Sequence, residues 1–496
     1  MAQNIPHIPA EKFEFVNTGA HLHDEKFKTK SRGYFSDAFL RFKKNKSSVI
    51  AAFIIAFLIL FAIVAPIISP YTVKDKDNVY TNFPPFIESI ADAELGIFDG
   101  SKTYPSLNER QIKKYEAIGI ETGYNPIIGD IEPYEVEEIV RGKPVTKTYY
   151  KVTLNRYYMV GAEYKNVSYE EFAKIQRFQD ETGIQVILPY TNSTDEADVW
   201  YKLVDGEIVP DYVTDPAKAG SVEYTSQRIP GDDGSYIYGW DLKNGTLNIR
   251  YCYYNYYQYK NGMTPSYIMG TDEYGRDLFD CIGTGARFSL IFAIVVSAIN
   301  LTIGAIYGAI QGYYGGAIDL AMDRVTDILS GVPSIVVMTL FKLHLAQKIG
   351  VLPSVLFAFV LTGWIGMAAL TRKQFYRFKS QEYIMAARTL GASDKRLMFK
   401  HIFPNSLGTM VTSCALVIPG VISSETSLTY LGIINLSSVV GTSIGELMEC
   451  GQRAMENAPH AMLFPALFIS LLLISFNLFG NGLRDAFNPS TRGVED

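Results

Sequence analysis

Six long apolar stretches occur along the chain, and polar or charged segments separate them. About 20 apolar residues cross the hydrocarbon core of a bilayer, so this pattern predicts a mainly α membrane protein with six transmembrane helices. The predicted spans are residues 49–68, 288–310, a third that ends near 343, 351–370, 406–422 and 462–478. Pro333 predicts a kink in the third span, because proline cannot donate the hydrogen bond that continues a helix.

The region between the first two spans has a different composition from the rest. Residues 71–270 carry 20 Lys and Arg, 30 Asp and Glu, and 25 of the 33 Tyr, so the block is acidic while the remainder is basic. A block of about 200 residues is long enough to bury a core of its own. We therefore predict an α+β domain inserted between transmembrane helices 1 and 2.

The predicted organisation has four parts. Residues 1–47 are a polar N-terminal tail. Residues 48–69 are the first membrane helix, which lies too far along the chain for a signal peptide and is expected to be an uncleaved anchor. Residues 70–265 form the insertion. Residues 266–496 form a five-helix core that contains a charged loop at residues 372–405.

Short helices and strands are predicted inside the insertion. Ser106 and Ser168 each begin a Ser-x-x-Glu pattern typical of a capping box, and the helices that follow are expected to end in Glu-Thr-Gly at Gly123 and Gly183. The repeated triplet leaves open a duplicated helix-turn-strand unit. The strands predicted from alternation and turn residues are 136–140, 145–154, 184–190, 199–204 and 236–240, with a turn at 141–144 joining the first two.

Residues 251–259, YCYYNYYQY, are the densest aromatic stretch. One interpretation is a platform of exposed rings for an extracellular peptide or a docking protein, since Tyr combines a large contact area with a polar tip. The interpretation we favour is a β-strand whose rings pack the domain or lie at the membrane interface. Stacking on nucleic acid would need a basic groove, and the acidic composition argues against it.

Basic residues predict the topology. Lys and Arg cluster between residues 30 and 46, before the first span, and such flanks stay in the cytoplasm. Counting spans from there places residues 70–265 outside the cell and the basic loop 372–405 inside. Both termini are then expected in the cytoplasm.

A charged amphipathic passage, residues 382–405, stands between the fourth and fifth spans. Gly391 predicts the end of a first helix, and Ser393 predicts the N-cap of a second. In that second helix apolar residues recur at i,i+4 from Met398 onward, which leaves the basic residues to water or to a partner. Pro404 is expected to end it. An ordinary surface helix pair is the alternative interpretation.

Two polar passages lie beside the second and third spans. The first is a turn in which glycine is expected to allow close packing and the charged residues to pair. The second places an Arg and an Asp at i,i+3, a spacing that suits an ion pair. The residues concerned are Asp272, Gly275, Arg276 and Asp277 in the first passage and Arg324 and Asp327 in the second.

Several passages resemble motifs of one protein family, the ABC importer permeases. Residues 382–405 resemble their cytoplasmic EAA loop, although Met385 stands where that motif usually has Glu. The other matches resemble the C-subunit branch of the oligopeptide, dipeptide and nickel permeases: GTDEYGRD (270–277), GARFSL (285–290), GYYGG (312–316), ETSLTYLG (425–432) and GNGLRD (480–485). The resemblance covers residues 31–70 and 266–490 and does not extend to the insertion.

The resemblance implies a role in coupling for the EAA-like loop, which in the family fits a cleft of the ATPase. The positions that carry over are Glu382, Tyr383, Ala386, Ala387, Gly391, Ala392, Ile402 and Pro404. It also implies a bacterial cytoplasmic membrane, a second permease subunit, two cytoplasmic ATPase subunits and an extracellular peptide-binding protein. The chain has no GxxxxGK[ST] loop to hold phosphates, so ATP and Mg²⁺ are expected on the partners, with no cofactor or catalytic residue here.

The end of the fifth span offers candidates for the translocation path. It contains Pro419 and runs into Ser424 and Glu425. An ionisable group near membrane depth is a functional hypothesis by default, because burying it is costly. Glu425 could equally lie beyond the hydrocarbon, hydrogen-bonded to Ser or Thr, and the sequence leaves both interpretations open.

Other substrates and other functions remain open at this stage. Oligopeptides are the first expectation, with dipeptides, haem or nickel as alternatives within the family. A membrane receptor or scaffold that senses through its ectodomain is a rival from another class. An ectoenzyme is disfavoured because residues 71–270 contain no His. The four Cys show no metal-ligand spacing, and at most one disulfide is expected.

Overall fold

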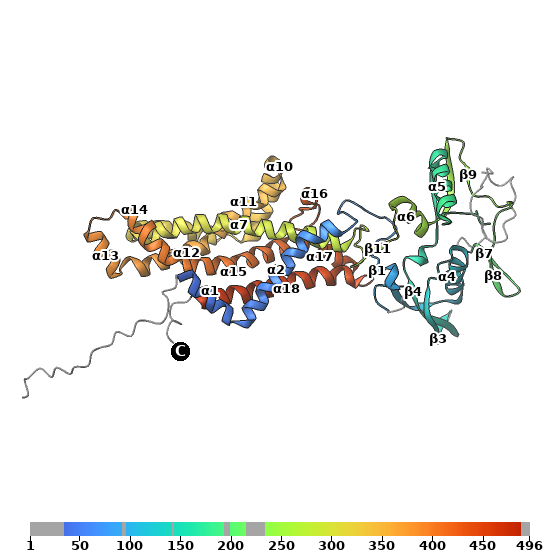
Figure 1. Ribbon diagram of the computed structural model, residues 1–496, viewed down its shortest axis with the longest axis horizontal. Coiled ribbons are helices and arrows are strands. Elements are labelled where there is room, and N and C mark those ends of the chain that lie inside the picture. Colours follow the sequence, from blue (N-terminus) through green and yellow to red (C-terminus); the bar gives the residue numbers. More distant parts are fainter. Residues whose placement is uncertain (1–33, 92–95, 141–142, 193–198, 215–233, 488–496) are drawn as a thin grey trace, which may run out of the picture.

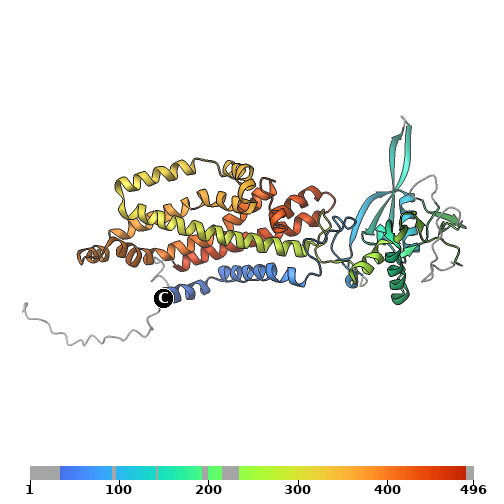
Figure 2. The ribbon, with the colours of Figure 1, turned by 90° about the horizontal axis from the view of Figure 1, so that it is seen from above.

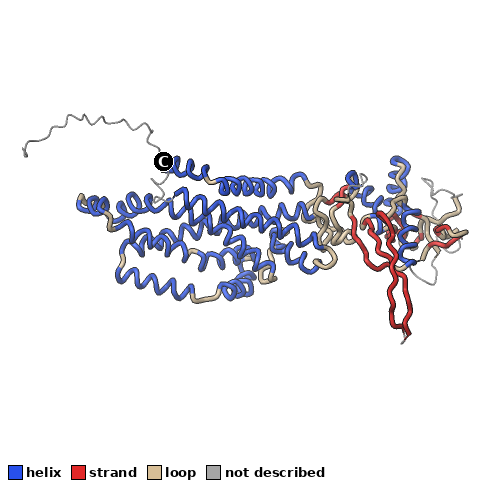
Figure 3. Tube along the Cα trace, turned by 90° about the horizontal axis from the view of Figure 1, so that it is seen from below, coloured by secondary structure: helices blue, strands red, loops and turns tan. Residues whose placement is uncertain are grey.

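The computed structural model describes residues 34–91, 96–140, 143–192, 199–214 and 234–487. The molecule is elongated, with a bundle of long helices at one end and a smaller domain at the other (Figure 1; Figure 2). In Figure 3 the helices of the bundle are blue, and the strands, in red, lie in the smaller domain. The prediction of a mainly helical protein with an α+β insertion is confirmed.

Five helices in the described part of the chain are long and apolar enough to cross a membrane, and a bent pair can supply a sixth. The long helices are α2 (Lys46–Ile68), α7 (Leu278–Tyr314), α11 with α12 (Val351–Gly363 and Ile365–Lys379), α14 with α15 (Asp394–Arg396 and Phe403–Tyr430), and α18 (Pro459–Phe487). The bent pair is α8 (Gly316–Ser330) followed by α9 (Ser334–Leu340) and α10 (Ala346–Ile349). The bend between its two arms is 72°, and Pro333 lies in the break, so the predicted kink is confirmed.

Within the described part of the helical bundle, three further helices were not predicted from hydropathy. They are α1 (Tyr34–Lys44) before the first span, and α16 (Ser437–Val440) and α17 (Ile444–Ala454) between α15 and α18. The buried side of α17 is formed by Ile444, Leu447, Cys450 and Ala454. These positions follow helical spacing, and that signal could have predicted α17.

The expectation that Pro404 ends a helix is wrong. The chain continues from α14 through a π-helical stretch, Leu397–Ile402, directly into α15. Pro404 occupies the first turn of α15. A π-helical stretch bonds each N–H one residue further back, so the missing N–H of a proline can be tolerated without a break.

Helices α7 and α12 approach each other through three glycines at i,i+4 spacing. A Cβ at Gly304 would lie 2.6 Å from the carbonyl oxygen of Trp364, and one at Gly308 would lie 2.1 Å from that of Ala368. Gly312 faces Arg372 in the same way, at 2.7 Å. Small residues at this spacing allow two backbones to pack closely in a membrane.

The insertion domain contains two units built on the same plan. The first consists of β2 (Ser101–Leu107), α4 (Glu109–Thr122), β3 (Ile127–Val140) and β4 (Lys143–Asn155), with strand order β2-β4-β3. The second consists of β5 (Ala162–Ser168), α5 (Tyr169–Thr182), β6 (Ile187–Leu188) and β10 (Thr246–Cys252), with order β5-β10-β6. In each unit a helix joins the two outer strands, and the central strand runs antiparallel to both.

The helix ends of the two units were predicted in part. Both helices end at a glycine in the left-handed conformation, Gly123 at φ 77° and Gly183 at φ 77°, as expected. Ser168 is the N-cap of α5, also as expected. The predicted cap at Ser106 is wrong, because β2 continues through Leu107 and the capping box of α4 joins Asn108 with Gln111.

The strand predictions were correct mainly for the long hairpin. Strands β3 and β4 form an antiparallel hairpin in which Val140 and Lys143 are the paired residues nearest the turn. This hairpin projects from the domain (Figure 3). The predicted turn lies partly outside the described residues, at 141–142. Strands β7 (Tyr201–Val204) and β8 (Glu207–Pro210) form a second hairpin. Of the strand expected at 184–190 only the two-residue strand β6 is present. Of the strand expected at 236–240 only Trp240 is in a strand, β9 (Trp240–Asp241), which pairs with β10.

The aromatic stretch 251–259 is not a strand throughout. Only its first two residues belong to β10, and Tyr253–Asn261 form helix α6. Tyr256 packs in the core of the second unit, whereas Tyr254 and Tyr257 pack in a separate aromatic cluster at the neck. A helix can bury rings on two faces at once. The expectation that these rings pack the domain is therefore confirmed, while the expected strand is wrong.

The neck joins the insertion to the bundle. There β1 (Phe86–Ile87), followed by α3 (Glu88–Ala91), pairs with β11 (Ser266–Tyr267). The ring of Tyr71 stacks on that of Tyr267 with centroids 4.7 Å apart. The hydroxyl of Thr271 accepts from the N–H of Phe83. The two ends of the insertion are thus tied to each other and to the turn that precedes α7.

Candidate functional site

The 382–405 element lies at the end of the bundle opposite to the insertion domain (Figure 1). Helix α13 (Glu382–Thr389) ends at Leu390, and Gly391 follows with φ 85°, a left-handed conformation that suits glycine. Ser393 has the backbone conformation of an N-cap but makes no side-chain capping bond. The predicted helix-Gly-helix arrangement is therefore present, with Ser393 at the predicted N-cap position.

Most of α13 is exposed. Ile384 is the buried residue of this helix, while Tyr383, Met385 and Leu390 are exposed, the last by 89%. Ala386 is also exposed and Ala387 is half-buried. A Cβ at Gly391 would meet nothing within 4 Å. The outer surface of this element therefore consists of exposed apolar side chains and of a glycine, Gly391, with free space around it.

The other side of the element is anchored on the bundle. Ile384, Leu397, Met398 and Ile402 are buried against α7 and α12, in a cluster that includes Phe375. Polar contacts reinforce it.

The hydroxyl of Tyr313 donates to Asp394 Oδ1 at 2.5 Å, and Arg388 donates to the Tyr313 oxygen at 3.3 Å. Asn405 donates to the hydroxyl of Tyr383 at 3.1 Å. These bonds connect the 382–405 element to the ends of α7 and α15.

A polar network that was not predicted ties α7, α8 and α12 together at the same end. Arg372 pairs with Asp319 at 2.7 Å and with Asp323 at 2.9 Å. Gln311 donates to Asp323 at 3.3 Å, and the hydroxyl of Tyr376 contacts Asp319. The acidic residues recur at i,i+4 on α8, a signal present in the sequence, but the partner Arg lies about 50 positions away and needs the fold.

The turn before α7 is tightly packed. Arg276 pairs with Asp272 at 2.7 Å, both of them buried, so their predicted pairing is confirmed. Arg276 also reaches Glu446 on α17 at 3.5 Å. A Cβ at Gly275 would lie 1.9 Å from the carbonyl oxygen of Asp77, which explains the need for glycine.

Asp277 has a different role from the predicted one. It caps α7 by accepting from the N–H groups of Phe279 and Asp280, and it accepts from the Ser69 hydroxyl at 2.8 Å. Burial raises the pKa of Asp277 to about 6, although these donors oppose the shift. At the other predicted pair, Arg324 and Asp327 lie 2.9 Å apart and are both exposed.

The candidates for the translocation path lie in α15. Glu425 is fully buried and accepts from Ser289 on α7 at 2.9 Å and from Thr429 at 3.3 Å. Pro419 is buried as well, whereas Ser424 is exposed. Within this chain, then, Glu425 joins two helices through hydroxyl groups, and Ser424 is the candidate that faces outward.

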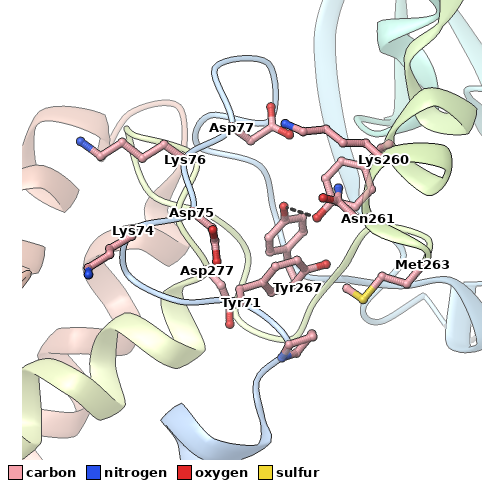
Figure 4. Close-up of a pocket in the computed structure, with 13 residues that line it drawn as sticks. Tyr71, Lys74, Asp75, Lys76, Asp77, Lys260, Asn261, Met263, Tyr267 and Asp277 are labelled. Carbon is pink, nitrogen blue, oxygen red and sulfur yellow. Dashed lines mark hydrogen bonds between the residues drawn. The ribbon is translucent and has the colours of Figure 1, made fainter. Parts of the chain in front are cut away.

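A cleft of about 430 Å³ opens where the neck meets the bundle (Figure 4). Its lining carries both signs of charge, from Lys74, Asp75, Lys76, Asp77, Lys260 and Asp277. In Figure 4 Lys260 and Asp77 point toward one another, while Lys74 points away from the cleft. Such a cleft can hold a ligand that carries both a positive and a negative group.

The four cysteines of the chain are free thiols.

Family models match both parts of the bundle. Residues 300–493 match the binding-protein-dependent transport system inner membrane component, and residues 33–85 match the N-terminal transmembrane domain of oligopeptide transport permease C. Most of the insertion, residues 86–265, lies between the two matched segments.

Relatives with described roles match nearly half of the chain. The oligopeptide transport system permease protein OppC of Bacillus subtilis is 39% identical over 45% of this chain and 72% of its own length. The dipeptide transport system permease protein DppC of Lactococcus lactis is 38% identical over 46% of this chain and 65% of its own. OppC of Haemophilus influenzae is 37% identical over 46% and 72%.

Proposed function

The chain belongs to the family of binding-protein-dependent transport system inner membrane components, in the branch of the oligopeptide and dipeptide permease C proteins, and we propose that it is the permease subunit of an ATP-driven importer of peptides. Oligopeptides are the first candidate substrates because relatives from two organisms carry that name, and dipeptides are the alternative. In this role the chain forms half of the translocation path.

The observation that carries the proposal is the exposed surface of α13 around Gly391. Tyr383, Met385 and Leu390 are exposed within eight residues of one another, and exposed apolar side chains concentrated on a short element favour a protein–protein contact. The opposite side of α13 packs on α7 and α12. An ATPase subunit that holds α13 would therefore move the ends of two spanning helices when ATP binds.

The complete transporter in this proposal has four further subunits. A second permease subunit completes the path, two cytoplasmic ATPases bind ATP and Mg²⁺, and an external binding protein delivers the peptide. The insertion, residues 70–265, faces outside, and both termini face the cytoplasm. The placement of α13 and the insertion domain at opposite ends of the bundle supports this orientation (Figure 1).

Substitution of Gly391 tests the coupling role. Gly391→Val forces a β-branched residue into a left-handed conformation, at a cost of about 1–2 kcal/mol. Because nothing lies within 4 Å of that Cβ, the strain stays local and the bundle should still fold. We expect peptide uptake by the complex in proteoliposomes to fall about tenfold, which corresponds to 1.4 kcal/mol.

Gly123→Val is the matched control. Gly123 also ends a helix in the left-handed conformation with open space around it, but it lies in the insertion domain. Uptake by this variant should remain within about twofold of the wild type. Equal uptake by both variants, with ATPase subunits bound to each, would remove the coupling role from Gly391.

For the insertion domain we propose a role at the external mouth, where it docks the binding protein or guides peptides toward the path. Its position at the opposite end from α13 and the mixed charges of the cleft at the neck support this role. The paired ends of β1 and β11 allow a clean deletion, since Ile87 and Ser266 lie opposite each other.

The deletion replaces residues 88–265 by an Asn-Gly turn, which suits a two-residue hairpin. We expect peptide uptake to fall while the ATPase subunits still bind and hydrolyse ATP at the basal rate. Uptake at the wild-type rate would contradict a role of the insertion in delivery and would leave the permease function intact.

A further inference from the structure

The outer part of the β3–β4 hairpin is a ribbon that belongs to no core. Strand β2 pairs with β4 between Tyr150 and Asn155, so beyond Tyr150 the strands β3 and β4 have only each other as strand neighbours. We call residues 134–140 and 143–149 the outer ribbon. None of its described side chains is buried. A two-stranded ribbon has almost no interior, so this one adds surface to the insertion domain.

The two faces of the outer ribbon differ in charge. Side chains alternate along a strand and directly paired residues share a face, so the register assigns each residue to one side. One face carries Tyr134, Glu138, Lys143, Lys147 and Tyr149. The opposite face, which we call the acidic face, consists of Glu135, Glu137, Ile139, Pro144, Thr146 and Thr148. In the described ribbon it holds two carboxylates and no basic side chain.

The first face pairs its own polar groups. Glu138 accepts a hydrogen bond from Lys147 at 2.6 Å and another from the hydroxyl of Tyr149 at 2.7 Å. The rings of Tyr134 and Tyr149 lie against each other with centroids 6.1 Å apart. The charge of Glu138 is therefore already compensated inside the ribbon.

The acidic face has no such compensation. Within the described part of the chain, neither Glu135 nor Glu137 has an ion-pair partner, and the residues opposite them are Thr148 and Thr146. Every residue of this face is exposed, and Ile139, beside the turn, is exposed by 81%. Two like charges at i,i+2 on one face repel each other, and cationic groups of a partner would relieve that repulsion.

The chemistry of the acidic face selects the class of partner. Its carboxylates would repel anionic lipid headgroups and nucleic acids. A ribbon also lacks the concavity that encloses a small ligand. It offers a strip of carboxylates that ends in one large apolar side chain. Such a strip suits a protein surface that carries Lys or Arg and a recess for Ile139.

We propose that the acidic face of the outer ribbon docks the external peptide-binding protein, which meets it with a basic surface. The insertion domain lies at the opposite end from α13, and the ribbon projects sideways there, so a protein seated on the outer end would lie beside it (Figure 1; Figure 2). The carboxylates guide the approach of the partner, and Ile139 holds it once bound. The assignment rests on the proposed function in peptide import.

Charge reversal tests the role of the carboxylates. Binding of the purified peptide-binding protein of the same organism to the assembled transporter in nanodiscs is followed by biolayer interferometry. Glu135→Lys combined with Glu137→Lys should lower the association rate constant at least about tenfold at low ionic strength, and added salt should narrow the difference. The matched control reverses two exposed carboxylates of α5, Glu170→Lys with Glu181→Lys, and should stay within about twofold of the wild type.

Ile139 is tested separately. Ile139→Ala should raise the dissociation rate constant about tenfold, because the apolar anchor is lost while the charges remain. Ile120→Ala is the control, since Ile120 is a second exposed isoleucine of the insertion, at 57%, and lies on α4. Its binding should match that of the wild type.

Cross-linking gives a readout that does not depend on the charge variants. Ile139→Cys in a Cys414→Ser background, labelled with a benzophenone maleimide, should cross-link to the peptide-binding protein on illumination, because the other three cysteines are buried. Ile120→Cys, labelled in the same way, should not. In uptake assays the ribbon variants should need at least about tenfold more peptide-binding protein for half-maximal uptake, with the maximal rate unchanged.

The outcomes separate the docking surface from the proposed function. Wild-type binding by the ribbon variants, equal weakening by the α5 control, or no cross-link from position 139 would overturn the docking surface and leave peptide import standing. Loss of the second permease subunit from the ribbon variants would also overturn it, since the ribbon would then belong to a subunit interface. A wild-type transporter that imports no peptide would overturn the proposed function and this assignment with it.

Discussion

The helical bundle and the insertion domain bury their interiors in different ways. In the bundle, α7 and α12 meet through Gly304, Gly308 and Gly312, so carbonyl oxygens lie where side chains would normally be. In the insertion domain, large rings fill the space, and Tyr80 and Tyr157 at the neck are fully buried. The bundle thus depends on short distances between backbones, whereas the insertion depends on the volume of its side chains and on pairing its buried polar groups.

The largest expected effect concerns a buried ion pair in the insertion domain. Arg250 and Glu121 are both almost completely buried and form two hydrogen bonds, one of them from Nη2 to Oε2 at 2.6 Å. Glu121→Ala leaves the guanidinium without its anion, so we expect the domain to lose about 3–5 kcal/mol of unfolding free energy. Limited proteolysis of the insertion and thermal unfolding measure this loss.

Its control is Glu170→Ala. Glu170 pairs with Lys174 at 2.7 Å on the exposed surface of α5, and such a solvent-screened pair contributes little to stability. If the two variants were equally stable, the insertion would not depend on its buried pair. Cleavage confined to the insertion, with the bundle intact, would sharpen the contrast between the two regions.

The next effect concerns the glycine contacts of the bundle. Gly308→Ala places a methyl group 2.1 Å from a backbone oxygen, and the helices must separate to admit it. We expect a loss of about 1–3 kcal/mol, read as a lower Tm in detergent. Gly420→Ala in α15 is the control, because nothing lies within 4 Å there, and it should be neutral or stabilising by up to about 1 kcal/mol. Equal Tm values would refute the close-contact account.

The smallest effect concerns the start of α4. Asn108→Ala removes the bond that Asn108 Oδ1 accepts from the N–H of Gln111 at 2.9 Å, and it should cost about 1 kcal/mol in unfolding of the insertion. Ser106→Ala should cost little, since Ser106 lies in β2. The reverse order of stability would restore the cap expected from the Ser-x-x-Glu pattern.

The spanning helices, the break at Pro333 and the end of α13 were predictable because each depends on residues that are close together in the sequence. Spanning helices follow from continuous apolar length, and the break at Pro333 follows from a missing donor. The end of α13 at Gly391 is equally local. Residues 251–259 were harder, because their Tyr spacing fits a strand or a helix until two separate cores need rings from both faces.

The sequence by itself determined the long apolar helices, the place of the insertion between the first two of them and the helix-Gly391-helix element, since hydropathy and glycine chemistry act within a few residues. Tertiary structure alone decided that Arg372 meets Asp319, that Arg250 meets Glu121, and that Gly363 lies against the side chain of Asn300. These contacts join residues that are far apart along the chain. Their partners are chosen by helix packing and burial, and no local pattern records that choice.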